Sequence, residues 1–126
     1  MNKTVISTSN APAAIGPYSQ GIAADSIVVT SGQLPIDPAT GAIVEGGIQA
    51  QTEQSLKNLE AILAEAGLTV DNVIKTTVYL ADIQDFAAMN EIYAKHFTAS
   101  FPARSAFQVA ALPKGALVEI EALCAR

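Results

Sequence analysis

Residues 103–125, ARSAFQVAALPKGALVEIEALCA, decide the fold that the sequence predicts. The second half of this stretch alternates apolar residues with Glu119 and Glu121, a period of two that is typical of a strand with one buried face. We expect strands at 103–109 and 116–125, separated by a Pro/Gly turn and paired with each other as a hairpin.

The first of these strands carries an arginine inside apolar sequence. Period two places Arg104 and Ala106 on one face and Phe107 on the other, so we expect Arg104 to share a polar face with Glu119. Two interpretations stay open for an arginine that faces glutamates. It forms a surface salt bridge, which adds little stability, or it belongs to a functional site.

The spacing of apolar residues predicts the elements outside this stretch. Residues 47–66 repeat a helical face at steps of three and four, and Gly67 stands where such a helix ends. A second helix is expected behind Asp85, where apolar residues return to helical spacing. Strands are expected at 20–24 and 27–30, which form a hairpin, and at 73–80, with a turn at 37–41. This order predicts an α+β sandwich in which helices cover one face of a mixed sheet.

The composition favours a single domain that forms an oligomer. The chain has 126 residues, which suits one domain over 1–126, and 50% of them are hydrophobic while 15% are charged. Soluble domains average about 25% charged residues, so this chain has more apolar surface than a monomer of its size hides.

Charge and rare residues exclude several classes of function. A net charge of −5 repels a phosphate backbone, so we expect no nucleic-acid partner. Cys124 and His96 are the only cysteine and histidine, which excludes an internal disulfide and argues against a metal site. We expect Cys124 to be a buried small hydrophobe and His96 to be a surface or helix-capping residue. No apolar run suits a secretory signal or a membrane span, so we expect a cytoplasmic protein without membrane contact.

Six segments resemble, in the same order, the blocks of the RidA (YjgF-type) family, over nearly the whole chain. They are residues 11–21 (APAAIGPYSQG), 30–35 (TSGQLP), 75–80 (KTTVYL), 85–90 (DFAAMN), 101–105 (FPARS) and 118–122 (VEIEA). No catalytic triad, P-loop or GxGxxG motif in the sequence points to another chemistry.

The resemblance implies a chorismate-mutase-like α+β fold and a homotrimer, whose sheets line a central barrel while ligand clefts lie between neighbouring subunits. It also implies a deaminase that needs no cofactor. RidA proteins hydrolyse the enamine and imine acids that pyridoxal-phosphate enzymes release, such as 2-aminoacrylate and 2-aminocrotonate, to 2-keto acids and ammonia. Small 2-imino and 2-keto acids are therefore the expected ligands.

By the same resemblance, three residues form the catalytic set. Arg104 corresponds to the arginine that binds the substrate carboxylate, which a guanidinium does through two charge-assisted hydrogen bonds. Glu119 corresponds to the acid that positions and activates water, and Glu121 competes with it for the place opposite Arg104. Tyr18 would put a hydroxyl in the cleft, where it can hydrogen-bond the substrate or the leaving nitrogen.

Four more residues are expected to bind or border the substrate: Gly32, Phe86, Asn90 and Ala106. Gly32 would allow a close approach of the backbone, while Phe86 and Asn90 also have ordinary core or cap explanations. Many family members have cysteine where this chain has Ala106. The contact there is attributed to backbone groups, so we expect activity to persist without regulation through a thiol.

Two other functions stay open. A non-catalytic regulatory module would use the same Arg104 cleft to sense small carboxylates, and only turnover separates it from the enzyme. A ribonuclease or translation inhibitor, an activity of some relatives, fits poorly with a net charge of −5 and the absence of a basic patch.

Overall fold

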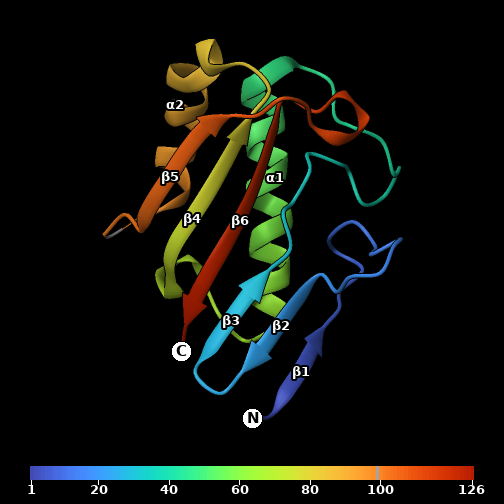
Figure 1. Cartoon of the computed structure of the whole chain (residues 1–126), viewed down its shortest axis with the longest axis vertical. Coiled ribbons are helices and arrows are strands. Elements are labelled where there is room, and N and C mark those ends of the chain that lie inside the picture. Colours follow the sequence, from blue (N-terminus) through green and yellow to red (C-terminus); the bar gives the residue numbers. More distant parts are fainter. Residues whose placement is uncertain (99) are drawn as a thin grey trace.

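The computed structural model describes residues 1–98 and 100–126, which fold into one mixed sheet covered by two α-helices (Figure 1). The strands lie in the order β1-β2-β3-β6-β4-β5, and every neighbouring pair is antiparallel except β4 and β5. The strands are β1 Lys3–Ile6, β2 Gly21–Ala24, β3 Ile27–Thr30, β4 Val73–Leu80, β5 Ala103–Gln108 and β6 Val118–Ala125, and the helices are α1 Gly47–Glu65 and α2 Phe86–His96. The predicted α+β class and mixed sheet are confirmed.

The first half of the chain folds as its turn residues predict. β2 and β3 pair as a hairpin around Asp25, whose positive φ of 54° closes the tight turn. In the predicted turn at 37–41, the N–H of Gly41 donates to the carbonyl of Asp37 at 2.8 Å. The sequence did not indicate β1, because Ile6 is the only buried residue of that strand and no alternation is visible.

The last two strands do not form the predicted hairpin. β6 lies between β3 and β4 and is antiparallel to both, whereas β5 lies at the edge of the sheet and runs parallel to β4 (Figure 1). Burial explains this arrangement. Every second residue of β6 is buried, which suits a central strand, while no residue of β5 is fully buried. Residues 109–117 cross over β4 to connect the two strands.

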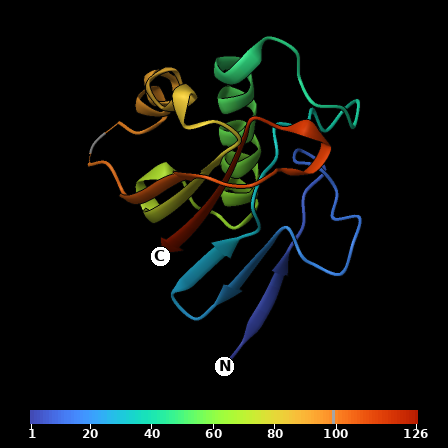
Figure 2. The same cartoon turned by 45° about the horizontal axis from the view of Figure 1, so that its top comes forward.

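Both helices pack on the same face of the sheet (Figure 2). α1 buries the predicted apolar stripe, and Gly67 follows its end with a φ of 77°. α2 begins after Asp85 as predicted, although the Asp85 side chain makes no capping hydrogen bond. This helix is shorter, and Met89 and Tyr93 are its buried residues. Phe86, at its start, is partly buried and also packs against the core.

The opposite face of the sheet is open. Side chains that alternate with core residues point away from the helices, and several of them are apolar and exposed: Val5, Ile27, Val29 and Phe107. An exposed apolar sheet face suits contact with another chain. Within the described ranges, no helix has the length and apolar character needed to cross a membrane.

Candidate active site

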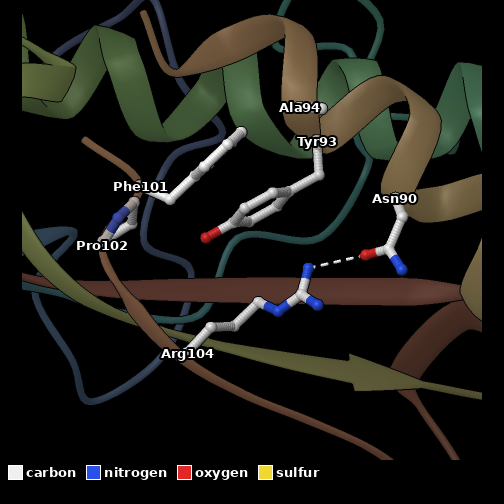
Figure 3. A pocket seen from close by; sticks show the side chains of 6 residues that line it. All are labelled: Asn90, Tyr93, Ala94, Phe101, Pro102 and Arg104. Carbon is white, nitrogen blue, oxygen red and sulfur yellow. Dashed lines mark hydrogen bonds between the residues drawn. The ribbon is translucent and has the colours of Figure 1, made fainter. Parts of the chain in front are cut away.

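Arg104 points from β5 toward α2, where neutral side chains hold it (Figure 3). Its Nη1 donates a hydrogen bond to Oδ1 of Asn90 at 2.7 Å. Its Cζ lies 4.8 Å from the centre of the Tyr93 ring and 5.4 Å from that of Phe86, so the cation contacts two aromatic rings. The Tyr93 hydroxyl is in turn hydrogen-bonded to Oγ1 of Thr76 at 2.7 Å. We call Arg104, Asn90, Tyr93 and Phe86 the Arg104 group.

Arg104 forms no salt bridge with an acidic side chain of the described residues. Its guanidinium keeps further N–H donors beside a cavity of about 430 Å³, which is lined by Asn90, Tyr93, Ala94, Phe101, Pro102 and Arg104. A cation with free donors in such a cavity can bind a small carboxylate through its planar fork. The salt-bridge interpretation of Arg104 is therefore wrong for the part of the chain that the structure describes.

Gly32 lies against Glu119 and also lines a cavity with Tyr18, and we call Glu119, Gly32 and Tyr18 the Glu119 group. Backbone hydrogen bonds of 2.8 and 3.2 Å between Gln33 and Ile120 bring the segment after β3 against β6. The Glu119 side chain then lies over Gly32, where a Cβ would collide with Oε2 of Glu119 and lie 2.8 Å from its carboxyl carbon. Gly32 and the half-exposed Tyr18 line a cavity of about 260 Å³. Only glycine leaves room for the carboxylate at this position.

The surroundings of Glu119 raise the pKa of its carboxyl above the usual value. Partial burial is the larger cause, because it penalises the charged form, and the negative charge of Glu121 adds to it. Glu121 accepts a hydrogen bond from the Tyr79 hydroxyl at 2.9 Å, whereas no described residue donates one to the Glu119 side chain. Burial and this bond raise the pKa of Tyr79 to about 12. Of the two glutamates, Glu119 is the one whose two carboxylate oxygens both lack a hydrogen bond from the described residues.

Arg104 and Glu119 do not share a face of the sheet, contrary to the expectation from the sequence. Arg104 lies opposite Thr76 of β4, which is buried under the helices. Glu119 lies opposite Tyr79, and positions three residues apart on one strand point to opposite faces. Glu121 does not face Arg104 either. One chain therefore carries the Arg104 group and the Glu119 group at two separate places.

Three other residues named from the sequence, Ala106, Cys124 and His96, lie outside the two groups. Ala106 points to the same side of β5 as Arg104 and packs against the core, with its backbone on the edge strand. Cys124 is fully buried, and burial raises the pKa of its thiol to about 11, which confirms that it is a small buried hydrophobe. His96 is not a surface or capping residue, because its side chain is only 10% exposed and contacts Glu53 and Glu60. Among the described residues there is no cluster of three potential metal ligands.

Sequence reasoning gave no functional role to Tyr93 or Phe101, although both line the Arg104 cavity. A signal for Tyr93 existed. Phe86, Asn90 and Tyr93 are separated by steps of four and three, so they share one face of α2 and reach the same neighbour. Phe101 had no comparable signal, because it lies in the connection that precedes β5.

The fold and the two groups define a small α+β protein with an arginine beside a cavity and a separate, partly buried glutamate. The family model described as endoribonuclease L-PSP matches residues 8–126. The chain belongs to this family, which is the RidA family that its sequence blocks resemble. It is also similar to the 2-iminobutanoate/2-iminopropanoate deaminase of Salmonella typhimurium, with 54% identity over 100% of this chain and 99% of that protein.

Solved structures show the same relationship. A crystal structure of the conserved Rid family protein YyfA from Yersinia pestis has a TM-score of 0.97 and 52% identity, and the match covers 99% of this chain and 100% of that one. The crystal structure of E. coli TdcF with bound serine has a TM-score of 0.92 and 47% identity, with 98% of each chain covered.

Proposed function

We propose that this protein hydrolyses 2-imino acids, together with their enamine tautomers, to 2-keto acids and ammonia. The observation that carries the proposal is the Arg104 guanidinium, which neutral partners hold beside a cavity and which pairs with no acid of the described residues. The relative from Salmonella typhimurium named as an imine deaminase, and the relative that binds serine, a small amino acid with a carboxylate, support it.

Arg104 binds and orients the substrate in this proposal. Asn90 takes one N–H of the guanidinium, and the remaining donors form the fork that receives both oxygens of the substrate carboxylate. The Tyr93 and Phe86 rings contact the guanidinium and limit its movement. A carboxylate fixed at two points leaves the neighbouring C=N carbon in one orientation, which lowers the entropic part of the barrier.

Glu119 supplies the base. A water molecule gives a proton to the Glu119 carboxylate while its oxygen forms a bond to the imine carbon; the π bond of C=N breaks, and the nitrogen takes up a proton from solvent. In the resulting carbinolamine, the protonated Glu119 returns its proton to the amino nitrogen, the C–N bond breaks with release of ammonia, and the hydroxyl loses its proton to solvent as the C=O bond of the 2-keto acid forms. The raised pKa of Glu119 makes it a stronger base than an ordinary glutamate. In this proposal the Tyr18 hydroxyl hydrogen-bonds the departing nitrogen.

A second copy of the chain completes the site in this proposal, because Arg104 and Glu119 of one chain lie on opposite faces of the sheet. The Arg104 group of one subunit meets the Glu119 group of its neighbour, and the exposed apolar side chains of the open face lie between subunits. The family resemblance makes the assembly a trimer. Imine hydrolysis then requires the oligomer.

We expect sedimentation velocity to give the mass of a trimer of the 13.0 kDa chain. The physical reason is that the open sheet face buries its apolar side chains only against other subunits. A stable monomer at micromolar concentration that still hydrolyses imines would contradict both the trimer and the shared site.

A coupled assay tests the proposed activity. A serine/threonine dehydratase generates 2-aminoacrylate or 2-aminocrotonate, and the appearance of the keto acid is followed with and without this protein. We expect faster release of keto acid in its presence. Binding of keto acids without acceleration would favour the regulatory module instead.

The family description names a ribonuclease, which the net charge of −5 disfavours. RNA binding that weakens with increasing salt would argue for that activity.

Gly32→Ala tests the position of the Glu119 carboxylate. The added Cβ would overlap with Oε2 of Glu119 and push the carboxylate aside, so we expect turnover to fall roughly tenfold to a hundredfold, as small misplacements do. The keto-acid affinity should change little, because Arg104 and the side chains that hold it are unchanged. In the coupled assay Gly16→Ala is the control, since its Cβ would make ordinary contact at 3.5 Å with the Tyr18 ring. Equal turnover of Gly32→Ala and the unmodified protein would contradict the role of Gly32.

A further inference from the structure

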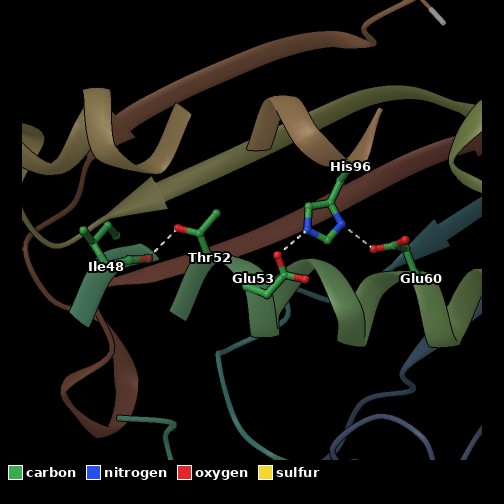
Figure 4. A network of polar contacts seen from close by, with 5 residues as sticks. All are labelled: Ile48, Thr52, Glu53, Glu60 and His96. Atoms are coloured by element: carbon green, nitrogen blue, oxygen red, sulfur yellow. Dashed lines mark hydrogen bonds and ion pairs between the residues drawn. The ribbon is translucent and has the colours of Figure 1, made fainter. Parts of the chain in front are cut away.

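His96, the last residue of α2, lies between two carboxylates of α1 (Figure 4). Its Nδ1 is 2.7 Å from Oε2 of Glu60, and its Nε2 is 2.9 Å from Oε1 of Glu53. The His96 side chain is only 10% exposed, while those of Glu53 and Glu60 are 39% and 41% exposed. One imidazole therefore joins the end of α2 to two turns of α1.

The geometry requires a particular protonation state. Ionised carboxylates only accept hydrogen bonds, so both ring nitrogens must donate, and only the imidazolium has two N–H groups. A neutral ring presents a lone pair to one carboxylate and loses that bond. The complete bridge therefore exists only while His96 is charged.

The groups around the ring are mainly the two carboxylates. On α1, Lys57 lies between Glu53 and Glu60 but is exposed, and on α2 the neighbouring Lys95 is exposed as well. The hydrogen bond to Glu60 is the largest influence and raises the pKa of His96, burial opposes it, and the bond to Glu53 adds to the increase. On the sheet side the ring shares a small cavity with residues that carry no ionisable side chain: Val73, Thr76 and Ala122.

The bridge bears on the Arg104 group because α2 supplies three of its members. Asn90 and Tyr93 lie within the two turns that precede His96, and both contact Arg104. Met89 and Tyr93 are the buried residues of α2, and Phe86 is a partly buried residue that packs against the core. The polar bridge adds a restraint at the opposite end of the helix from Phe86.

We propose that doubly protonated His96 is a positioning residue for the Arg104 pocket: it fixes α2 on α1 so that Asn90 and Tyr93 hold the guanidinium, and carboxylate affinity falls as rising pH opens the bridge. This inference rests on the proposed function, because the ligand is the carboxylate of a 2-keto acid. His96 does not touch the ligand and acts only through α2.

The direction of the pH dependence follows from the raised pKa. The bridge is complete below the usual imidazole pKa of 6.5, and its stabilising contribution is lost as the pH rises through the raised pKa of His96. Because His96 is the only histidine, its ring proton resonance in an NMR titration reports this transition without ambiguity.

The experiment compares 2-oxobutanoate affinity across the His96 transition in four proteins. In the unmodified protein we expect affinity to weaken about fivefold from low to high pH, at the lower end of ordinary coupling between sites. His96→Ala should bind at every pH about as weakly as the unmodified protein does at high pH, which is about fivefold more weakly than the unmodified protein at low pH. Lys95→Ala, a change of an exposed neighbour, should behave as the unmodified protein does.

Glu53→Gln is the decisive variant, because it preserves the bridge without the charge. The amide that this substitution introduces can donate to a neutral His96 ring or accept from a charged one, while the other ring nitrogen still donates to Glu60. We expect affinity to stay high and nearly constant with pH. If His96→Ala fails to fold, the comparison of Glu53→Gln with the unmodified protein still tests whether the His96 bridge controls affinity.

Two outcomes overturn the inference: affinity that stays constant through the His96 transition in the unmodified protein, or affinity that falls equally in Glu53→Gln. Absence of 2-oxobutanoate binding at every pH overturns the proposed function instead. The Arg104 Nε–H resonance then still tests the positioning role. A shift that follows the His96 transition, and is absent in Glu53→Gln, supports the role, and an unchanged resonance overturns it.

Discussion

Arg104→Ala is expected to lose both 2-keto-acid binding and imine hydrolysis. Among the described residues that line the cavity, Arg104 is the only cation, so the substitution leaves the substrate carboxylate without its hydrogen-bonding fork. Truncating one partner of such a charge pair costs about 2–5 kcal/mol, so affinity should fall by at least about 30-fold. Because substrate and transition state carry the same carboxylate, kcat/KM should fall at least as far.

Arg104→Lys separates charge from geometry. An ammonium keeps the positive charge but presents neither the planar fork nor a flat face to the Tyr93 and Phe86 rings. We expect weak binding and low turnover, closer to the alanine variant than to the unmodified protein. Keto-acid titration and the coupled assay measure both effects.

Arg126→Ala is the matched control for the loss of an arginine. Arg126 is exposed, and its side chain makes one hydrogen bond, of 3.4 Å, to the carbonyl of Ala66. The Arg126→Ala variant should retain keto-acid binding and imine turnover. Full imine hydrolysis by a correctly folded Arg104→Ala trimer would show that the pocket between α2 and β5 is not the substrate site.

Local patterns were enough to predict most of the elements. α1 and the β2–β3 hairpin arise from neighbouring residues, so periodicity and turn chemistry specify them. The place of β5 in the sheet depends instead on which distant strand it pairs with. Adjacent strands in sequence were expected to pair, but the strongly alternating β6 takes the central position and leaves β5 parallel to β4 at the edge.

Arg104 was predicted on the wrong face of the sheet for a similar reason, because the orientation of β5 depends on residues that are distant in the sequence. Period two separated Phe107 from Arg104, and Arg104 was expected on the polar face with Glu119. In the structure Phe107 is 45% exposed on the open face, and Arg104 lies under α2. An edge strand of a sheet whose outer face is apolar gives no local signal of which side is inside.

All members of the two groups except Tyr93 were named from the family resemblance, because spacing alone did not connect Tyr18, Gly32 and Glu119. They lie far apart in the sequence, and the Gln33–Ile120 backbone bridge brings two of them together. What the resemblance did not indicate is that α2 clamps the guanidinium through Tyr93. That contact depends on how the helix packs against the sheet.

Glu119→Gln is expected to separate catalysis from binding. The amide has nearly the same shape as the carboxylate and still fits over Gly32, but it cannot accept a proton from water. Keto-acid affinity should stay near that of the unmodified protein, since Arg104 and its partners are untouched. Turnover should fall about 10²-fold or more, the usual contribution of a general base.

The pH profile of turnover tests the role of Glu119 most directly. The active species is the Glu119 carboxylate, so turnover of the unmodified protein should rise as the pH increases through the raised pKa of Glu119, and Glu119→Gln should lose that limb. Glu121→Gln removes the neighbouring negative charge that helps to raise this pKa, so it should move the limb to lower pH and keep substantial turnover. If Glu121→Gln abolished the limb while Glu119→Gln kept it, Glu121 would be the base, and the place of Glu119 over Gly32 would have only a structural meaning.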